Sequence, residues 1–360
     1  MKILVIMKRF GANKDMVMQN FGRQVRLFES LSKHGHNIDF LCPDYKKYEN
    51  KDIKKGKINY YIRPYSIINH FNFAKELKIL IKRHKYDIIV GTTDPLIGIF
   101  GYFYSKKFNI KYIYDIQDEY SDYDTYKLPF VKYFDRIAMK NSDIVLTVSD
   151  SLNQHVKKIR KKPTYTIQNG IDLRYFKKID KNKARKILNL PKGKIIIFIG
   201  ALTKFKGVDI LIEAFKEIKN TIPDAYLLLS GAIYKDININ HDSVIYRKYP
   251  KREDVITALN AADVAVIPNR KDTFSEYCFP YKLLEYMSVN VPIVATAVGD
   301  VAEILKPFKG SLCIPNNVND LKAKIFIQLK KKNINYRKIA MNYTWEKLSK
   351  KLDNIITGLK

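Results

Sequence analysis

The chain has 360 residues, of which 46% are hydrophobic, and it carries 65 Lys and Arg against 36 Asp and Glu, a formal charge of +29. This length exceeds one ordinary hydrophobic core, so we expect two domains, and the apolar content excludes a disordered chain. The charge favours anionic partners, namely nucleic acid, an acidic membrane surface or phosphorylated small molecules, unless it only reflects a lysine-rich solvated surface.

Short apolar runs alternate with longer amphipathic runs along the chain, a pattern typical of βα units on a parallel sheet. The first half contains six apolar runs that we expect to be strands: 2–7, 37–41, 87–92, 111–116, 143–149 and 164–168. The second half repeats the plan with 195–200, 225–231, 243–249, 263–268, 292–296 and 311–315. The pattern therefore predicts an α/β protein with two doubly wound Rossmann-like domains.

The expected domains follow from this plan. They are an N-terminal domain over 1–168, a linker over 169–182, a C-terminal domain over 183–335 and a closing helix over 336–360. The closing segment offers an apolar helix face made of Trp345, Leu348, Leu352, Ile355 and Ile356. Open α/β sheets bind ligands outside the carboxyl ends of their strands. Two such sheets facing each other would enclose a cleft for a substrate in two parts.

Cysteine use and hydropathy predict the compartment. Cys42, Cys278 and Cys313 are far apart and flanked by apolar residues, which predicts buried free thiols in a reducing environment. The N-terminus, MKILVIMKRF, is too short and too charged for a signal peptide. No run reaches the roughly 18 to 20 apolar residues that span a bilayer. We expect a cytoplasmic protein that is at most peripheral at the inner face of the membrane.

The stretch FPYKLLEYMSVNVPIVAT, from residue 279, places two charged residues in an apolar helix. Pro280 suits the first helical position, Asn290 can adopt the left-handed conformation that ends a helix, and the predicted helix runs to Ser288. Lys282 and Glu285 are one turn apart on the same face. They form either a surface salt bridge or a pair of ligands, one for a phosphate and one for a sugar hydroxyl.

The block PNRKDTFSEYCFPYKLLEYMSVNVPIVATAVGDVAEIL (268–305) resembles the donor-binding region of the retaining glycosyltransferases of family four, which have the GT-B fold. The family pattern is E-G-F-G-x-x-x-x-E-A-M-A-x-G-x-P-V-V-A, and Glu285 matches its second glutamate. The resemblance implies that Glu285 holds the ribose of a nucleotide. GALTKFKGVDILIEAF (200–215) is similar to G-R-L-x-x-x-K-G-x-D-x-L-I-x-A-F, which implies that Lys206 binds the donor diphosphate.

Two further motifs extend the resemblance over nearly the whole chain. YTIQNGIDLRYF (165–176) is similar to the family's N-G-[IV]-D-x-x-x-F at the domain junction, and FGRQVRLFESLSKHGHNIDFL resembles its N-terminal helix. The resemblance implies catalytic roles for Lys206, Lys282, Glu285 and Asp118. It implies substrate-binding roles for Gly11, Gly22, Gln117, Asn169, Gly200, Glu276, Phe279, Pro280, Tyr281 and Leu284.

The chain departs from the family pattern at two positions. Tyr277 stands where the first glutamate is expected, with Glu276 one residue away, and Ala201 stands in place of the arginine. We expect Lys282 to replace some of the missing positive charge. His34 and His36 flank Gly35 at a predicted helix end, where the helix dipole favours a C-terminal cap over a metal site. Family members generally need no metal, so the resemblance implies no cofactor.

The resulting prediction is retaining transfer of a sugar from a nucleotide-diphosphate sugar to a glycan or lipid-linked acceptor, in polysaccharide, glycolipid or lipid-linked glycan synthesis. One alternative is a nucleotide-sugar epimerase or a phosphorylase of the same fold. Another is a non-catalytic basic protein that binds nucleic acid or a protein partner, although the sequence contains no recognisable nucleic-acid module, so we expect no nucleic acid. The segment IFGYFYSKKFNIKYIY (99–114) either rests on anionic lipids or forms an ordinary buried βα unit.

Overall fold

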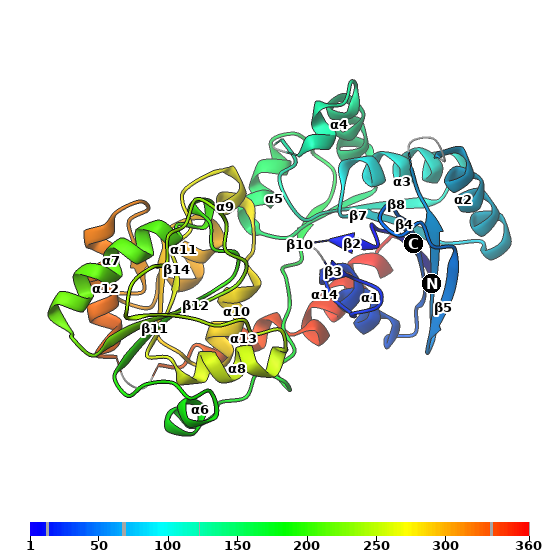
Figure 1. Ribbon diagram of the computed structural model, residues 1–360. Helices are drawn as coiled ribbons and strands as arrows, with labels where there is room; N and C mark the ends of the chain where they lie inside the picture. Colours follow the sequence, from blue (N-terminus) through cyan, green and yellow to red (C-terminus); the bar gives the residue numbers. More distant parts are fainter. Residues whose placement is uncertain (12–13, 67–69, 122, 332–333, 360) are drawn as a thin grey trace. The chain divides into compact units, whose positions relative to one another are not determined.

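The computed structural model describes every residue except 12–13, 67–69, 122, 332–333 and 360. The chain folds into two compact units (Figure 1). Unit 1 contains Met1–Gly170 and Trp345–Lys360, and unit 2 contains Ile171–Thr344. Each unit is built on a sheet of mostly parallel strands with helices against it, which confirms the predicted α/β class with two Rossmann-like domains.

The sheet of unit 1 has the strand order β10-β9-β8-β7-β1-β4-β6-β5 in the described part of the chain. Its strands are β1 (Lys2–Ile6), β4 (Asn37–Asp44), β5 (Lys51–Lys55), β6 (Ile58–Pro64), β7 (Ile88–Thr92), β8 (Lys111–Ile116), β9 (Ile144–Thr147) and β10 (Thr164–Thr166). Neighbouring strands pair in parallel except β5, which pairs antiparallel with β6 at the edge. All six strands predicted in the first half are present, whereas β5 and β6 were not predicted.

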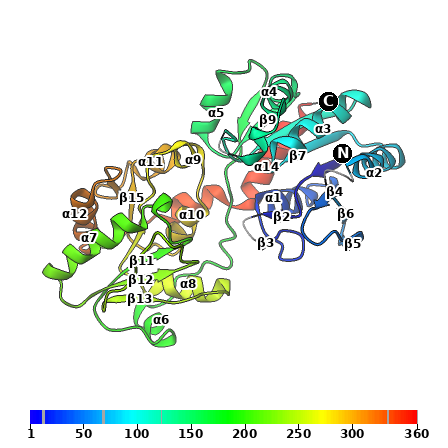
Figure 2. The ribbon, with the colours of Figure 1, turned by 45° about the horizontal axis from the view of Figure 1, so that its top comes forward.

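The helices of unit 1 are α1 (Arg23–Ser32), α2 (His70–His84), α3 (Pro95–Lys107), the 3-10 turn η1 (Asp124–Lys127), α4 (Val131–Asn141), α5 (Asp150–Lys157) and α14 (Trp345–Thr357). The C-terminal helix α14 lies beside α1 in both views (Figures 1 and 2). It buries Trp345, Leu348, Leu352 and Ile356, as its periodicity predicts, whereas Ile355 is only partly buried. A C-terminal helix therefore completes unit 1.

Polar contacts fix α14 in place. The Oγ atoms of Ser30 and Ser349 lie 2.9 Å apart, and His36 Nε2 lies 2.8 Å from an Asp353 carboxylate oxygen. His34 is also within 3.8 Å of Asp353. The two histidines predicted to end a helix thus contact the C-terminal helix, which sequence patterning did not anticipate.

The sheet of unit 2 has the strand order β13-β12-β11-β14-β15-β16. Its strands are β11 (Lys194–Ile199), β12 (Ala225–Ser230), β13 (Val244–Tyr246), β14 (Val264–Ile267), β15 (Ile293–Thr296) and β16 (Leu312–Cys313), all close to predicted positions. Its helices are α6 (Lys181–Ile187), η2 (Lys204–Lys206), α7 (Val208–Thr221), α8 (Arg252–Ala261), α9 (Thr273–Tyr277), α10 (Tyr281–Ser288), α11 (Gly299–Leu305), α12 (Val318–Leu329), α13 (Arg337–Ala340) and η3 (Met341–Tyr343). Figure 2 shows α7 and α12 side by side on the same face of the sheet, and both contribute residues to its core.

The structure bears on the expectations for two segments, and the first needs correction. The single helix expected over 336–360 is instead α13 and η3 in unit 2, followed by α14 in unit 1. Residues 99–114 form most of α3 and part of β8, which buries Tyr112, Ile113 and Tyr114 inside the sheet, in line with the buried βα alternative. The exposed residues of this segment are Phe103, Lys106, Lys107, Asn109 and Lys111, and contact with lipid stays a prediction.

Two further predictions concern the state of the three cysteines and the lack of a membrane-spanning helix. Cys42, Cys278 and Cys313 are buried and free, as predicted. Among the described residues, the helices are all too short or too polar to cross a bilayer.

Candidate functional site

The first element of the site is the turn between β11 and α7, which carries Lys206. Gly200 ends β11 with φ 146°, and Gly207 opens α7 with φ 68°. A Cβ atom on Gly207 would lie 1.9 Å from the Pro268 carbonyl oxygen, so only glycine fits there. Between them, Thr203 caps η2 by accepting a hydrogen bond from the Lys206 backbone N–H at 3.1 Å. These constraints hold Lys206 directly before the N-terminus of α7, where backbone N–H groups favour anions.

The second element is α10, which carries Lys282 and Glu285. The helix runs Tyr281–Ser288, and Pro280 is its N-cap with φ −75° and ψ 128° rather than its first helical residue. Asn290 has φ 55°, which confirms the predicted left-handed end of the helix. The predicted helix was therefore misplaced by one residue at its start.

The Lys282 ammonium turns back over the sheet toward β11. Its Nζ lies 4.2 Å from the centre of the Phe198 ring. A Cβ atom on Gly200 would come within 3.0 Å of this Nζ, so Gly200 makes room for the lysine. The Lys206 Nζ lies 4.1 Å from the ring centre of Phe274 in α9 and 4.8 Å from that of Phe205. Each lysine therefore rests on an aromatic face, which attracts a cation electrostatically.

Lys206 influences the charge of Lys282. Burial, and then repulsion from the Lys206 ammonium, lower the pKa of Lys282 to about 7, while the Glu285 carboxylate opposes this shift. Bringing two like charges together at a partly desolvated site costs free energy. An anion bound beside them would remove that cost.

The remaining residues predicted in unit 2 lie around this pair. Glu276 is partly exposed in α9, and Tyr281 is partly exposed at the start of α10. Phe279 and Leu284 are 2% and 0% exposed, and the Phe279 ring lies 5.3 Å from that of Tyr343. The side chains of Phe279 and Leu284 thus pack in the core of unit 2, and any direct part for them in substrate binding stays a prediction.

In unit 1, Gly22 caps the N-terminus of α1. Its φ is 94°, a conformation that favours glycine, whereas Gly11 lies in the short strand β2 (Phe10–Gly11) with no positive φ. The sequence left open which glycine approaches a phosphate. The backbone of Gly22 alone requires glycine, although either role stays a prediction.

A buried ion pair lies directly beyond Gly22. The Arg23 guanidinium donates to Asp115 in β8 at 2.6 Å and to the carbonyl of Gln168 at 2.8 Å, and both charged side chains are at most 1% exposed. The Gln117 amide donates to Thr92 at 2.7 Å. This network joins α1 to the carboxyl ends of β7 and β8.

The sequence analysis placed Gln117 and Asp118 beside the donor sugar. Gln117 Nε2 also lies 3.2 Å from Gln24 Oε1 and 3.3 Å from Asp115 Oδ2. Asp118 accepts a hydrogen bond from the Tyr123 hydroxyl at 2.7 Å. Both side chains are partly exposed at the carboxyl edge of the sheet, within the same neighbourhood as Gly22.

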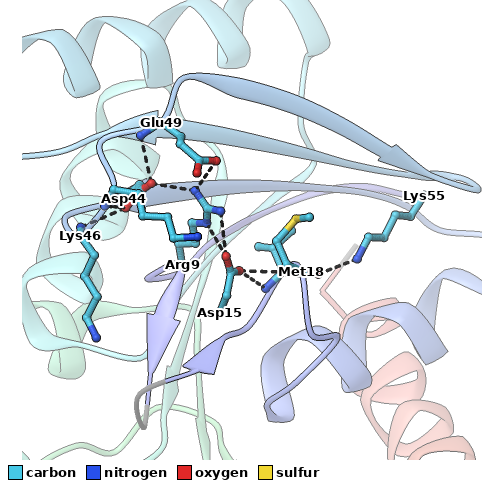
Figure 3. A network of polar contacts seen from close by, with 9 residues as sticks. Arg9, Asp15, Met18, Asp44, Lys46, Glu49 and Lys55 are labelled. Atoms are coloured by element: carbon cyan, nitrogen blue, oxygen red, sulfur yellow. Dashed lines mark hydrogen bonds and ion pairs between the residues drawn. The ribbon is translucent and has the colours of Figure 1, made fainter.

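Figure 3 shows a second polar network in unit 1, in which Arg9 contacts Asp15, Asp44 and Glu49. Arg9 is 1% exposed and donates to Asp44 at 2.7 Å, to Glu49 at 2.9 Å and to Asp15 at 3.0 Å. Asp15 belongs to β3 (Lys14–Asp15), which pairs with β2. Because Arg9 neutralises carboxylates from both the hairpin and β4, it ties this hairpin to the sheet.

The predicted residues therefore fall into separate groups. Gly200, Lys206, Lys282 and Glu285 gather at one edge of the unit 2 sheet, and Gly22, Gln117 and Asp118 gather at one edge of the unit 1 sheet. Asn169 is 8% exposed and follows Gln168, whose carbonyl accepts from Arg23.

Sequence reasoning missed several residues that hold these groups in position: Arg23, Thr92, Asp115, Phe198 and Phe274. One of them carried a usable signal, because Asp115 is a charged residue inside the apolar run KYIYDI. A charge at a buried strand position requires a partner. Arg23, which directly follows a glycine at a predicted helix start, is the cation that could have been predicted as the partner of Asp115.

Known proteins agree with this arrangement. The family model described as Glycosyltransferase Family 4 matches residues 24–175, and the one described as Glycosyl transferases group 1 matches residues 180–347. An uncharacterized glycosyltransferase of Methanocaldococcus jannaschii, MJ1178, is 27% identical over 89% of this chain and 90% of its own. The Bacillus subtilis protein TuaC, a putative teichuronic acid biosynthesis glycosyltransferase, is 25% identical over 81% of this chain and 80% of its own.

A solved structure shares the fold. Anabaena Alr3699/HepE in complex with UDP aligns with a TM-score of 0.75 and 16% identity, over 99% of this chain and 100% of that one. The two family models together match both units of the chain, with a short gap at the domain junction. The chain therefore belongs to glycosyltransferase family 4, a family of retaining enzymes with the GT-B fold, and is a glycosyltransferase.

Proposed function

We propose that this enzyme transfers a sugar from a UDP-sugar to an acceptor hydroxyl, and that Lys206 and Lys282 bind the diphosphate of the donor. The observation that carries the proposal is that Lys282 lies over Phe198 and beside Gly200, at the edge of the unit 2 sheet where Lys206 precedes α7. Burial and Lys206 lower the pKa of Lys282 to about 7. A lysine whose charge is opposed by burial and by a neighbouring lysine favours an anionic ligand, because a diphosphate stabilises its charged form. UDP is the nucleotide to test first, since the neighbouring HepE structure contains it.

The chemistry of the reaction suits these residues. The bond between the anomeric carbon and the diphosphate breaks, and the acceptor oxygen bonds to the same face of the sugar while its proton passes to the departing diphosphate. Negative charge grows on the diphosphate during this step. Lys206, Lys282 and the N-terminus of α7 would stabilise that charge, which is where most of the catalysis should lie.

The other predicted residues take supporting roles in this proposal. Glu285 holds the ribose hydroxyls, and Gln117 and Asp118 in unit 1 contact the transferred sugar through hydrogen bonds. The acceptor binds unit 1 and is a glycan or a lipid-linked glycan, in line with the teichuronic acid synthesis named for the TuaC relative. The enzyme works in the cytoplasm at the inner face of the membrane, as its basic charge suggests.

The test is calorimetric titration of the purified enzyme with UDP and UDP-glucose. Lys206→Ala and Glu285→Ala are expected to weaken UDP binding roughly tenfold to hundredfold, the usual worth of hydrogen bonds to charged groups. Lys204→Ala is the matched control, because Lys204 lies in the same turn but is exposed. Equal affinities in all variants would contradict the proposal, and isomerisation of UDP-glucose without an acceptor would favour an epimerase.

A further inference from the structure

A cavity of about 420 Å³ opens beside the sheet of unit 1, apart from the lysine pair of unit 2. Pockets that hold small molecules have volumes of roughly 300 to 1,000 Å³. Its walls are mainly apolar and come from α2, α3 and the segments after β4 and β6; they include Tyr45, Tyr65, Phe73, Leu96, Phe100 and Phe103. Nothing in the proposed donor site uses this cavity.

The charges in the cavity wall cancel. Among the described residues that line it, Lys8 and Asp94 are the only charged ones, and they form an ion pair. The other oxygen of Asp94 accepts the Leu96 backbone N–H at 2.9 Å and so caps α3. A phosphate or a sugar would therefore find few partners here, whereas a hydrocarbon group would remove apolar wall from water.

The mouth of the cavity continues into an exposed aromatic surface. Phe103 lines the cavity and is 44% exposed, and its ring lies 5.7 Å from that of Phe134 in α4. Tyr133, 64% exposed, lies 5.4 Å from Phe134. The same two helices, α3 and α4, carry the exposed lysines Lys106, Lys107, Lys132 and Lys140. Aromatic rings together with lysines are typical of surfaces that meet an anionic lipid layer.

The part of the cavity wall formed by Lys8 and Asp94 adjoins residues that contact the candidate sugar site. Lys8 follows β1, and its backbone N–H donates to Thr93 at 3.0 Å, next to Thr92, which accepts from Gln117. Asp94 is the residue after Thr93. An elongated molecule in the cavity would therefore run from the aromatic surface of α3 and α4 to the edge of the sheet where Gln117 lies.

We propose that this cavity holds the hydrocarbon chain of a lipid-linked acceptor, with the chain entering past Phe103 and the polar head emerging at the carboxyl edge of the unit 1 sheet. This inference rests on the proposed function for the role of acceptor. It selects a lipid-linked acceptor over a water-soluble glycan. The neutral apolar wall, the exposed aromatic mouth and the polar far end each match one part of such a molecule.

The test uses n-alkyl β-D-glucopyranosides with butyl, hexyl and octyl chains, below their micelle concentrations, titrated into the full-length protein by calorimetry. Affinity is expected to rise about fourfold for each added methylene, the value for burying one CH₂ group. Leu96→Trp fills the cavity and is expected to abolish this dependence on chain length. Ile187→Trp, at a 59% exposed position in unit 2, is the matched control and should behave as the wild type.

A second pair of variants covers the case in which Leu96→Trp does not fold. Phe103→Ser removes the aromatic ring at the mouth of the cavity. Tyr234→Ser is its control, because it removes a ring that is 51% exposed in unit 2. Only Phe103→Ser is expected to weaken octyl glucoside binding. Affinity that does not depend on chain length, or that survives Leu96→Trp, would overturn the inference, and so would tighter binding of phenyl glucoside than of octyl glucoside.

UDP titration of the same samples separates this inference from the proposed function. If the protein binds UDP but its affinity for alkyl glucosides does not depend on chain length, the inference about the cavity is wrong and the proposed function stands. Binding that depends on chain length, in a protein that does not bind UDP, supports the cavity and defeats the proposed donor site.

Discussion

The charged residues at the carboxyl edges of the two sheets have different partners. In unit 1, Arg23 pairs with Asp115 and Lys8 pairs with Asp94, so positive charge meets negative charge. In unit 2, Lys206 lowers the pKa of Lys282, so like charges lie together. In the first arrangement each cation pairs with a carboxylate, whereas in the second the Lys206 ammonium opposes the charge of Lys282 and the Glu285 carboxylate supports it. This difference supports the proposals that the diphosphate binds unit 2 and that the sugar and an apolar acceptor bind unit 1.

The largest expected effect comes from breaking the pair in unit 1. Arg23→Met leaves the Asp115 carboxylate, which is 0% exposed, without its guanidinium. Loss of one partner of a buried ion pair costs roughly 3 to 5 kcal/mol of unfolding free energy. Urea unfolding followed by the fluorescence of Trp345 measures this, because it is the only tryptophan in the sequence and belongs to unit 1.

The double variant Arg23→Met with Asp115→Asn is the control for this prediction. It removes both charges, so it is expected to recover most of the lost stability. A double variant as unstable as Arg23→Met would mean that packing and the bonds to the Gln168 carbonyl, rather than charge, explain the loss.

Lys282→Met in unit 2 is expected to raise the unfolding free energy at pH 6, in contrast to the loss expected for Arg23→Met. The folded pKa of Lys282, about 7, is below its unfolded value of about 10.4, so between these pH values the unfolded chain binds more protons. Wild-type stability therefore rises with pH across this window, and the full penalty applies below pH 7. At pH 6, Lys282→Met should be more stable than the wild type by on the order of a few kcal/mol, and the difference should shrink toward pH 10.

Circular dichroism melting at pH 6 and pH 10 measures this difference, with Lys204→Met as the control for a lysine that is exposed in the same unit. A Lys282→Met protein that melts below the wild type at pH 6 would show that the lysine is stabilising and that the contrast between the two edges is wrong.

The smallest effect separates the two glycines of unit 1. Gly22→Ala puts a side chain at φ 94° and is expected to cost roughly 1 to 2 kcal/mol. Gly11→Ala brings a Cβ within 3.2 Å of the flexible Met16 sulfur at an ordinary backbone angle, so a smaller loss is expected. Trp345 fluorescence in urea compares the two, and equal losses would remove the distinction between them.

The sequence predicted the sheets well because their strands are continuous apolar runs. It missed β5 and β6 because their sequences, KDIKK and INYYIRP, are not continuous apolar runs. A hairpin could still have been predicted, because Gly56 precedes an alternating apolar pattern at Ile58, Tyr60 and Ile62. The closing helix was predicted too long because periodicity does not show where a chain passes between units. The break follows Thr344.

The charged residues of the candidate site could be predicted from the sequence, but the side chains that surround them could not. The resemblance to family four singled out Lys206, Lys282 and Glu285. On spacing alone, a surface salt bridge was the favoured interpretation of Lys282 and Glu285. The rings of Phe198 and Phe274 beneath the lysines, and the ion pair of Arg23 with Asp115, depend on contacts across the fold. Sequence spacing contains no record of those contacts.

Proton uptake on UDP binding tests the central claim most directly. At pH 8 Lys282 is mostly neutral in the unbound enzyme, and a diphosphate beside it should raise its pKa and draw in roughly 0.5 to 1 proton. Calorimetry in two buffers of different ionisation enthalpy gives this number. The account predicts uptake in the wild type that disappears in Lys282→Met, and UDP binding without proton uptake at pH 8 would contradict it.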